Sequence, residues 1–250
     1  NSSYSCVLGV SGGKDSTRQA LFLKECVGLN PLLVSLNYPP EQISQRGVNN
    51  LSNLIEKGFD CISVSCAPKT WKNLMKYSFE NLGNWAKATE PALFSSVPIV
   101  ALAYGIPLIF WGESAANQLG DQGVAGLSPW DGNSLKHSNT LQGGDINWIK
   151  DSGILPRNVY WHHYPSDEQF KNGSIQIVFL DYFMPQFTLF DNGTFSSLQG
   201  LEIRKSNPMK DSEYLGTSCL DEDFINLNMF VRYLKFGFGR TSDIVNLEIR

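Results

Sequence analysis

The stretch Ser11-Gly12-Gly13-Lys14-Asp15-Ser16-Thr17 joins two segments of different character. The segment before it, Tyr4 to Val10, is short, apolar and contains β-branched residues, which is typical of a buried strand. The segment after it, Lys14 to Val27, repeats apolar residues at helical spacing. The sequence therefore predicts a strand, a glycine turn and a helix in direct succession.

The glycine turn has the chemistry of an anion-binding loop. Glycine lets the backbone turn sharply and approach a ligand closely. Successive backbone N–H groups and the positive end of the following helix then attract a negative group. The order of residues differs from both the GxxxxGK(S/T) loop and the GxGxxG fingerprint, and the structural alternative is an ordinary helix start. The residues that we expect to hold phosphate are Ser11, Gly12, Gly13, Lys14, Asp15, Ser16 and Thr17.

Asp15 places a carboxylate inside this predicted phosphate loop. A carboxylate beside phosphates is repulsive unless a cation lies between them, so Asp15 predicts a bound Mg²⁺. The alternative is a first-turn carboxylate that interacts only with the helix dipole.

The chain continues with short apolar segments that alternate with amphipathic ones. We expect further strands over Pro31 to Tyr38, Cys61 to Cys66, Pro107 to Trp111 and Gln176 to Phe183. We expect further helices over Gln42 to Lys57, Lys69 to Trp85, Ala92 to Tyr104 and Asp221 to Phe236. This alternation favours an α/β fold with a mainly parallel sheet flanked by helices. Ligands of such sheets bind at the carboxyl ends of the strands.

The regularity changes after residue 120. We expect residues 1–120 to form a nucleotide-binding core and residues 121–250 to add a substrate loop and complete the same catalytic domain. Asp121 to Gly144 is rich in Gly, Ser, Asn and Asp, which predicts a long surface loop, either a substrate lid or a plain insertion. The chain begins Asn-Ser-Ser, and we expect it to be a fragment of a longer protein.

Composition excludes several classes of protein. Hydrophobic residues make up 42% of the 250 residues, enough for a sizeable core. The 24 acidic and 20 basic residues give a net charge of −4, which argues against a nucleic-acid groove driven by bulk charge. No apolar run approaches the 18 residues of a membrane-spanning helix, so we expect no membrane insertion.

The cysteines and histidines do not predict a metal site. The five cysteines include no CxxC pair, which argues against a disulfide framework or a zinc site in this chain and favours a reducing compartment. No cysteine has a neighbour that would activate its thiol. We expect His162 and His163 to lie on the surface or in a substrate loop, and we take the Asn-x-Ser/Thr tripeptides at Asn1, Asn172 and Asn192 as chance occurrences.

The sequence from Ser11 to Ser16 resembles the SGGxDS signature of the PP-loop ATP pyrophosphatases, which have an adenine-nucleotide alpha hydrolase-like fold. This resemblance implies cleavage of ATP between the α and β phosphates and transfer of AMP to a carbonyl oxygen. It also implies that Asn37, after the second strand, lines the adenine side. Gly112 and Glu113, after the fourth strand, would face the sugar or the reacting centre, and the alternative for Glu113 is a solvated carboxylate.

Further segments resemble the N-acetyl sugar amidotransferases within that superfamily. They are PLIFWGE at 107–113, FLDYF at 179–183, Gly216-Thr217, KFGFGRTSD at 235–243 and LEIR at 247–250. The chain has Gly112-Glu113-Ser114 where family members usually have Gly-Glu-Asn. The cysteine-rich, zinc-binding stretch and the helical tail usual in the family would lie outside these residues.

This second resemblance implies an ATP- and Mg²⁺-dependent amidotransferase of the bacterial cytoplasm. It would adenylate the N-acetyl carbonyl of a sugar, possibly nucleotide-linked, and substitute ammonia to give an acetamidino sugar for lipopolysaccharide or O-antigen synthesis. Because no glutaminase nucleophile is present, ammonia would come from a glutaminase subunit. Nucleic acid is not an expected partner, and a homo-oligomer is left open.

Lys235 and Arg240 bracket a glycine-rich turn near the end of the chain. Brought to the loop, they would neutralise the α-phosphate and the leaving pyrophosphate, and we assign them with Asp15 as catalytic residues. The alternative is an ordinary helix C-terminus with Lys235 in its last turn. Two other functions also remain open: another PP-loop adenylating enzyme, such as one for tRNA thiolation, and a non-catalytic nucleotide-binding subunit.

Overall fold

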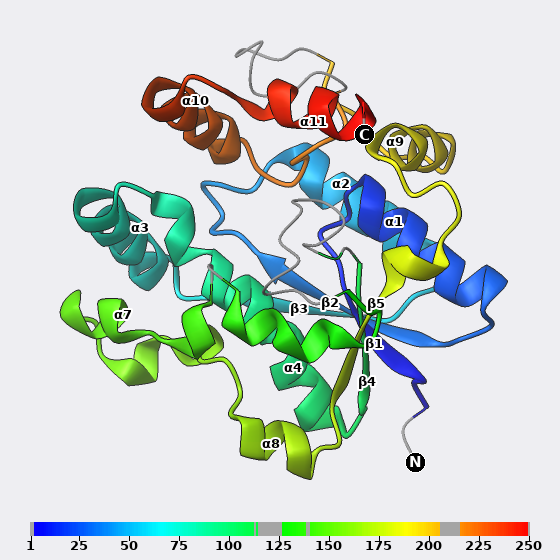
Figure 1. Cartoon of the computed structure of the whole chain (residues 1–250), viewed down its shortest axis with the longest axis horizontal. Coiled ribbons are helices and arrows are strands. Elements are labelled where there is room, and N and C mark those ends of the chain that lie inside the picture. The colour runs from blue at the N-terminus through cyan, green and yellow to red at the C-terminus, as the bar shows by residue number, and fades with distance from the viewer. Residues whose placement is uncertain (1–2, 113, 115–126, 139–140, 206–215, 250) are drawn as a thin grey trace.

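Five parallel strands form one sheet at the centre of the molecule (Figure 1). The computed structural model describes residues 3–112, 114, 127–138, 141–205 and 216–249. The strands are β1 (Cys6–Gly9), β2 (Pro31–Asn37), β3 (Cys61–Ser65), β4 (Leu108–Trp111) and β5 (Gln176–Phe179). They lie in the order β3-β2-β1-β4-β5, and every neighbouring pair is parallel. The predicted α/β fold with a mainly parallel sheet flanked by helices is confirmed.

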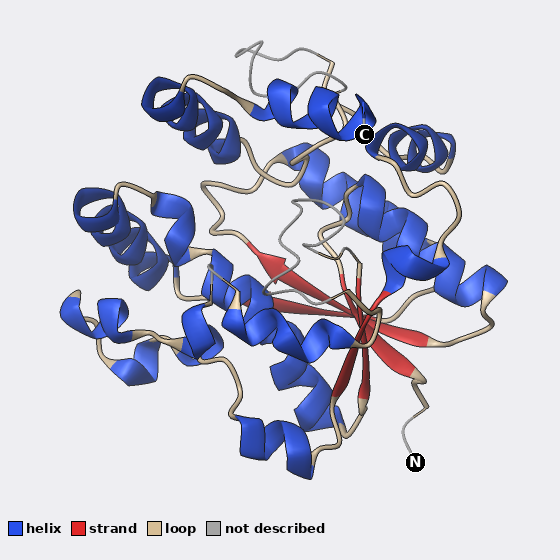
Figure 2. Ribbon diagram, viewed as in Figure 1, coloured by secondary structure: helices blue, strands red, loops and turns tan. Residues whose placement is uncertain are grey.

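Helices cover both faces of this sheet (Figure 2). The longer ones are α1 (Lys14–Leu21), α2 (Gln45–Glu56), α3 (Pro68–Leu82), α4 (Glu90–Tyr104), α9 (Leu189–Leu198), α10 (Phe224–Phe236) and α11 (Arg240–Ile249). The short ones are η1 (Phe22–Cys26), a π-helical continuation of α1, with α7 (Asn147–Asp151) and α8 (Asp167–Asn172). The 3₁₀ turns are η2 (Trp85–Ala88), η3 (Asp131–His137), η4 (Gln142–Gly144), η5 (Pro156–Asn158), η6 (Tyr160–His162) and η7 (Leu180–Phe183).

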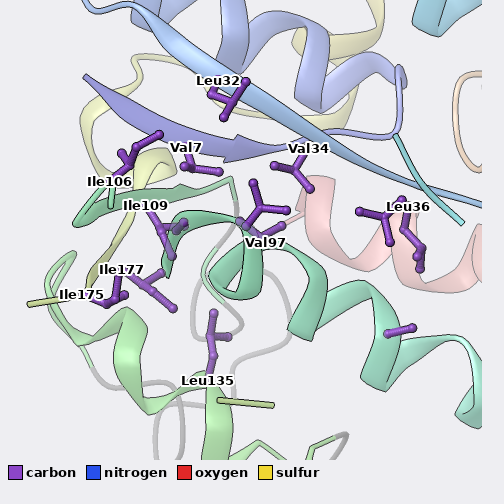
Figure 3. Packing of buried hydrophobic residues seen from close by; sticks show 14 of the residues in the cluster. Val7, Leu32, Val34, Leu36, Val97, Ile106, Ile109, Leu135, Ile175 and Ile177 are labelled. Atoms are coloured by element: carbon purple, nitrogen blue, oxygen red, sulfur yellow. The ribbon is translucent and has the colours of Figure 1, made fainter. Parts of the chain in front are cut away.

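The core consists of two layers, because successive strand residues point to opposite faces of the sheet. Val7 of β1 and Val34 of β2 pack with Val97 of α4 on one face (Figure 3). Cys6 and Leu8 of β1 pack on the other face, together with residues of α1, η1 and α2. The sheet is therefore buried between two helical layers, and both the first loop and the chain after β4 emerge at the same edge.

Residues 127–137 differ from the surface loop that the sequence predicts. Gly132 packs so closely on Ile177 that a Cβ there would lie 2.5 Å from the Ile177 carbonyl oxygen. The Asn133 side chain accepts from the Ile177 N–H at 2.8 Å and donates to the Ile175 carbonyl at 3.0 Å. This segment therefore covers the edge strand β5, which satisfies backbone groups that a bare edge would expose. Residues 121–126 and 139–140 of the predicted loop lie outside the described residues.

Two further expectations need correction, and one helix was not expected. The strand predicted over Gln176 to Phe183 ends at Phe179 and continues as the turn η7. The sequence also did not predict α9, whose residues include helix-disfavouring Gly, Asn, Asp and Thr. His162, predicted on the surface or in a loop, is 1% exposed, and its Nε2 lies 3.1 Å from the Ala88 carbonyl oxygen.

Both parts of the predicted domain organisation contribute to the same sheet, since β5 comes from residues 121–250 and the other four strands from residues 1–120. Within the described ranges, no helix combines the length and apolarity needed to cross a bilayer.

Candidate functional site

The loop after β1 lies where the strand order reverses. β2 and β3 follow on one side of β1, and β4 and β5 lie on the other. Crossover connections leave this point in opposite directions, which opens a crevice at the carboxyl ends of β1 and β4. A cavity of about 370 Å³ occupies the crevice. The sequence analysis expects a ligand at this edge of the sheet, where the cavity lies.

The cavity walls come from six parts of the chain. The β1 end and its loop contribute Ser11 and Gly13, and α1 contributes Lys14, Asp15, Ser16 and Gln19. The β2 side contributes Leu36 and Tyr38, α4 contributes Leu93, Ser96 and Val97, and the β4 end contributes Trp111 and Gly112. Residues 217–221 form the remaining wall. Five of the predicted loop residues and Gly112 are thereby brought together around one space.

The two loop glycines face different surroundings. Gly12 has a φ of +77°, and a Cβ there would lie 2.8 Å from the backbone nitrogen of Leu51 in α2. Gly12 therefore allows α2 to approach the loop, and it does not line the cavity. A Cβ on Gly13 would meet only the Ser11 Oγ, at 3.2 Å, so the Gly13 Cα is open to the cavity.

The N-terminus of α1 has no side-chain cap among the described residues. Its N-cap is Gly13, which has no side chain to accept from the first-turn N–H groups. Those N–H groups have no acceptor within the helix. Together with the Lys14 ammonium, they give the cavity an end suited to an anion.

Helix α9 braces the same end of α1. Asn192 is fully buried and donates through Nδ2 to Asp15 Oδ1 at 2.6 Å, while its Oδ1 accepts from Arg18 Nη1 at 2.7 Å. Ser196 Oγ donates to the Lys14 carbonyl at 2.6 Å. The other Asp15 oxygen pairs with Lys14. This network holds the Asp15 carboxylate in one orientation, and it also removes Asn192 from the accessible surface that a glycosylation site needs.

Asn37 lies in an adjoining cavity of about 160 Å³ on the β2 side. The two cavities share Ser11, Leu36, Tyr38 and Asp221 as lining residues. Asn37, the residue expected on the adenine side, thus lines this adjoining cavity. Thr17 differs from the other loop residues, because it is buried away from both cavities and its hydroxyl has no hydrogen-bond partner among the described residues.

Lys235 is not brought to the loop. Its ammonium donates to the carbonyl of Gly83, the residue that ends α3, and it lines neither cavity. This is the helix-end arrangement that the sequence left as the alternative, and a catalytic role for Lys235 stays a prediction. Arg240 begins α11, but its side chain lies outside the described part of the structure, as does Glu113.

Two acidic groups with raised pKa values, Asp221 and Glu222, lie at and next to the wall formed by residues 217–221. Desolvation raises the pKa of Asp221 to about 6, against the lowering effect of Arg46 and Arg204. Desolvation also raises the pKa of Glu222 to about 7, although Gln42 donates to it at 3.1 Å. Asp221 itself lines both cavities, so burial raises the pKa of an acidic residue at the site.

The sequence analysis missed Gln19, Tyr38, Asn192 and residues 217–221 as parts of this site. Cys219 also lines the cavity, and the sequence analysis assigned it no role. Its backbone has a φ of 49°, which is unusual for a residue other than glycine. The segment Gly216-Thr217-Ser218-Cys219 consists of small and polar residues. This composition is the only local sequence pattern that could have pointed to these residues as part of the site.

Two of the solved structures that resemble this chain are distant neighbours of it. No family model and no curated protein matches the chain. The "predicted subunit of tRNA methyltransferase" from Methanocaldococcus jannaschii DSM is 21% identical with a TM-score of 0.34, covering 58% of this chain and 74% of its own. The NMN synthetase from Francisella tularensis is 15% identical with a TM-score of 0.36, covering 68% of this chain and 87% of its own. At these TM-scores, neither neighbour assigns a family or an activity to this chain.

Proposed function

We propose that the chain is a PP-loop enzyme that cleaves ATP between the α and β phosphates and transfers AMP to a carbonyl oxygen. The observation that carries the proposal is the uncapped N-terminus of α1, which opens through Gly13 into the cavity between β1 and β4. A backbone cradle of this kind binds phosphate through N–H groups and the helix dipole.

The two adjoining cavities suit the two ends of ATP. We assign the phosphates to the cavity with Ser11, Gly13 and Lys14, and the adenosine to the cavity with Asn37. The cavities have volumes of about 370 and about 160 Å³, and together they fall within the range of small-molecule sites. Ser11 lines both cavities, so it lies where the two ends of the nucleotide would join.

The donor at Asp15 fits Mg²⁺. A carboxylate is a hard oxygen ligand of the kind that Mg²⁺ prefers, and Mg²⁺ bound with ATP commonly uses only one or two carboxylates plus phosphate oxygens. Asn192 fixes one carboxylate oxygen, while the other pairs with Lys14, whose ammonium would pair with a phosphate oxygen once ATP and Mg²⁺ are bound. When bound, Mg²⁺ would neutralise charge on the phosphates.

For the acceptor, we propose the N-acetyl group of a sugar, on the strength of the sequence resemblance. An acetamide is a poor electrophile, and ammonia does not displace its oxygen as water. Transfer of AMP to that oxygen releases pyrophosphate and makes AMP the leaving group. Ammonia then adds to the carbon, and loss of AMP and a proton gives the acetamidine. No enzyme nucleophile is needed, so the chain's task is positioning and charge neutralisation.

The same proposal assigns the remaining roles. Lys235 and Arg240 would act on the phosphates, which for Lys235 requires α10 to move from the position that the structure shows. A glutaminase subunit would supply ammonia in the bacterial cytoplasm, and the product would enter surface polysaccharide synthesis. We expect free ammonia, but not glutamine, to support the reaction of this chain alone.

One observation favours a second candidate, a PP-loop adenylating enzyme that transfers sulfur, as in tRNA thiolation. Such an enzyme needs a cysteine near the activated carbonyl, and Cys219 lines the cavity. The net charge of −4 argues against an RNA face.

The test is pyrophosphate release from ATP and Mg²⁺ in the presence of UDP-N-acetylglucosamine or other N-acetylhexosamines, with ammonium salt or glutamine, and with products followed by mass spectrometry. An acetamidino product, about one mass unit lighter, supports the amidotransferase. Sulfur incorporation into tRNA that depends on Cys219 supports the second candidate. ATP binding without pyrophosphate release under either condition would identify a non-catalytic nucleotide-binding subunit.

A further inference from the structure

The side-chain amide of Gln19 is buried at the cavity without a hydrogen-bond partner. Gln19 is 3% exposed, and its amide nitrogen has no partner among the described residues. The residue nevertheless lines the cavity that holds the loop. Buried amides are almost always paired, because an unpaired one loses its bonds to water and gains nothing in return. Because the amide lies at the cavity, a ligand bound in the cavity is the partner that fits its position.

Gln19 lies on the face of α1 that also presents the loop residues. It follows Asp15 by four positions and Ser16 by three, so the three side chains share one side of the helix. All three line the same cavity. The amide thus lies about one helical turn from the uncapped N–H groups.

Gly112 confines the amide from the opposite side. A Cβ on Gly112 would lie 2.2 Å from Gln19 Nε2 and 2.3 Å from Oε1. The chain therefore needs a glycine at the end of β4 to leave room for this side chain. The amide is held between α1 and β4, at the crevice where the strand order reverses.

We propose that Gln19 is a phosphate-contacting residue, whose amide donates to an oxygen of the pyrophosphate unit of ATP. The inference rests on the proposed function, and it adds a contact outside the loop itself. In the structure Nε2 is the buried, unpaired atom, so rotation about the terminal side-chain bond must turn the NH₂ group toward the cavity when the ligand binds. A neutral amide adds a donor without disturbing the balance of charge between Lys14 and Asp15.

The experiment compares Gln19→Met and Gln19→Glu with the wild-type protein. Methionine keeps the unbranched shape but removes both polar ends, and glutamate keeps the shape but replaces the donor with a negative charge. The matched control is Ser95→Ala, because Ser95 on α4 is also fully buried, its hydroxyl also lacks a partner among the described residues, and it does not line the cavity. Calorimetric titrations with magnesium pyrophosphate, MgATP, AMP and UDP-N-acetylglucosamine, and the thermal midpoint without ligand, are measured for each protein.

We expect Gln19→Met to weaken pyrophosphate and ATP binding by about tenfold or more and to leave AMP binding unchanged. Its midpoint without ligand should equal or exceed that of the wild type, because the unpaired amide is gone. Gln19→Glu should weaken both phosphate ligands further through like-charge repulsion, and Ser95→Ala should change none of the affinities.

Three results would overturn the inference. Unchanged pyrophosphate affinity in Gln19→Met, with a lower midpoint, would make the amide structural. An equal loss for AMP and pyrophosphate would place the contact on the nucleoside monophosphate. Unchanged nucleotide and pyrophosphate affinities with weaker binding of UDP-N-acetylglucosamine would place it on the acceptor. Failure of the wild-type protein to bind ATP or pyrophosphate would instead contradict the proposed function itself.

Discussion

The side-chain amide of Asn192 donates a 2.6 Å hydrogen bond to the carboxylate of Asp15, which lies 177 positions earlier in the chain. The same amide accepts from Arg18, one turn further along α1. The Asn192 amide thus connects α9, a helix that no local sequence pattern predicted, to the loop before α1, which the sequence predicted most clearly.

Removal of this bridge should weaken MgATP binding without unfolding the protein. Asn192→Ala leaves one Asp15 oxygen without its donor, and we expect about a tenfold loss of affinity in Mg²⁺ and a smaller loss in its absence. Asn192→Asp should be worse, because two carboxylates would face each other, and it should partly recover as the pH falls and one of them is protonated. Calorimetric titration with and without Mg²⁺ checks both variants.

The matched control is Thr188→Ala. Thr188 caps α9 by accepting from the Asp191 N–H at 3.0 Å and does not touch Asp15. It should lower the free energy of unfolding by about 1 kcal/mol and leave MgATP affinity unchanged. Equal affinities for Asn192→Ala and the wild type would show that Asp15 needs no support from α9.

Alanine substitutions at the two loop glycines should separate stability from binding. Gly12→Ala combines a positive φ with a Cβ 2.8 Å from the α2 backbone, so we expect unfolding to become easier by more than about 2 kcal/mol. Gly13→Ala has an ordinary φ of −76° and an open Cα, so it should fold normally but lose MgATP affinity, because its methyl group enters the phosphate space. Urea denaturation and calorimetric titration measure the two effects, and a Gly13→Ala variant with full affinity would place the phosphates elsewhere.

Gly112→Ala should act through Gln19. The added methyl group would overlap the amide, so Gln19 must move away from the position described above. We expect pyrophosphate affinity to fall in Gly112→Ala and in Gln19→Met, and the double variant to lose no more than the larger single effect. Additive losses in this double-mutant cycle would mean that Gly112 contacts the ligand independently of Gln19.

His162 should make the protein less stable in mild acid. Burial lowers the pKa of His162 from 6.5 to about 4, while the Ala88 carbonyl opposes that shift. As the pH falls, His162 in the unfolded chain therefore binds a proton before His162 in the folded chain does. The contribution of neutral His162 to the free energy of unfolding is complete above about pH 6.5 and is lost as the pH falls toward 4. The loss amounts to about 3 kcal/mol in free energy of unfolding.

Urea unfolding between pH 7.5 and 4.5 tests this expectation. His162→Phe should be less stable at pH 7.5, because it abandons the Ala88 carbonyl, but its stability should depend less on pH. The control is His163→Gln, since His163 is exposed and its replacement should keep the wild-type slope. A wild-type slope in His162→Phe would assign the acid sensitivity to other groups.

Lys235→Met should reveal which of its two roles holds. In the structure its ammonium binds the carbonyl at the C-terminus of α3. If this contact is its role, its loss should cost about 0.5–1 kcal/mol of stability and leave turnover unchanged. Stability is measured by urea denaturation and turnover by pyrophosphate release. A large fall in turnover at unchanged stability would instead show that α10 brings Lys235 to the phosphates.

The predicted strands and the loop came from local patterns. Runs such as Pro31 to Asn37 are apolar on both faces because helices cover both sides of the sheet, and the glycine turn follows β1 directly in the chain. By contrast, α9 is stabilised by contacts of Asn192 and Ser196 with α1, which outweigh its weak helix propensity. Gln19 shares its helix face with Asp15 and Ser16, and only the position of Gly112, which directly follows the distant strand β4, shows what its amide faces.

The brace formed by α9 and the wall formed by residues 217–221 have a consequence for the timing of assembly during synthesis. The ribosome makes the loop before α9 and residues 217–221. Asp15 therefore has no Asn192 to bind until the chain has grown by the 177 positions that separate the two residues. At bacterial and eukaryotic elongation rates, this interval is roughly 10–35 s. A chain released early, after β5 but before α9, could complete the five-stranded sheet and still lack the groups that orient Asp15. Incomplete translation products would therefore bind nucleotide more weakly than the finished protein.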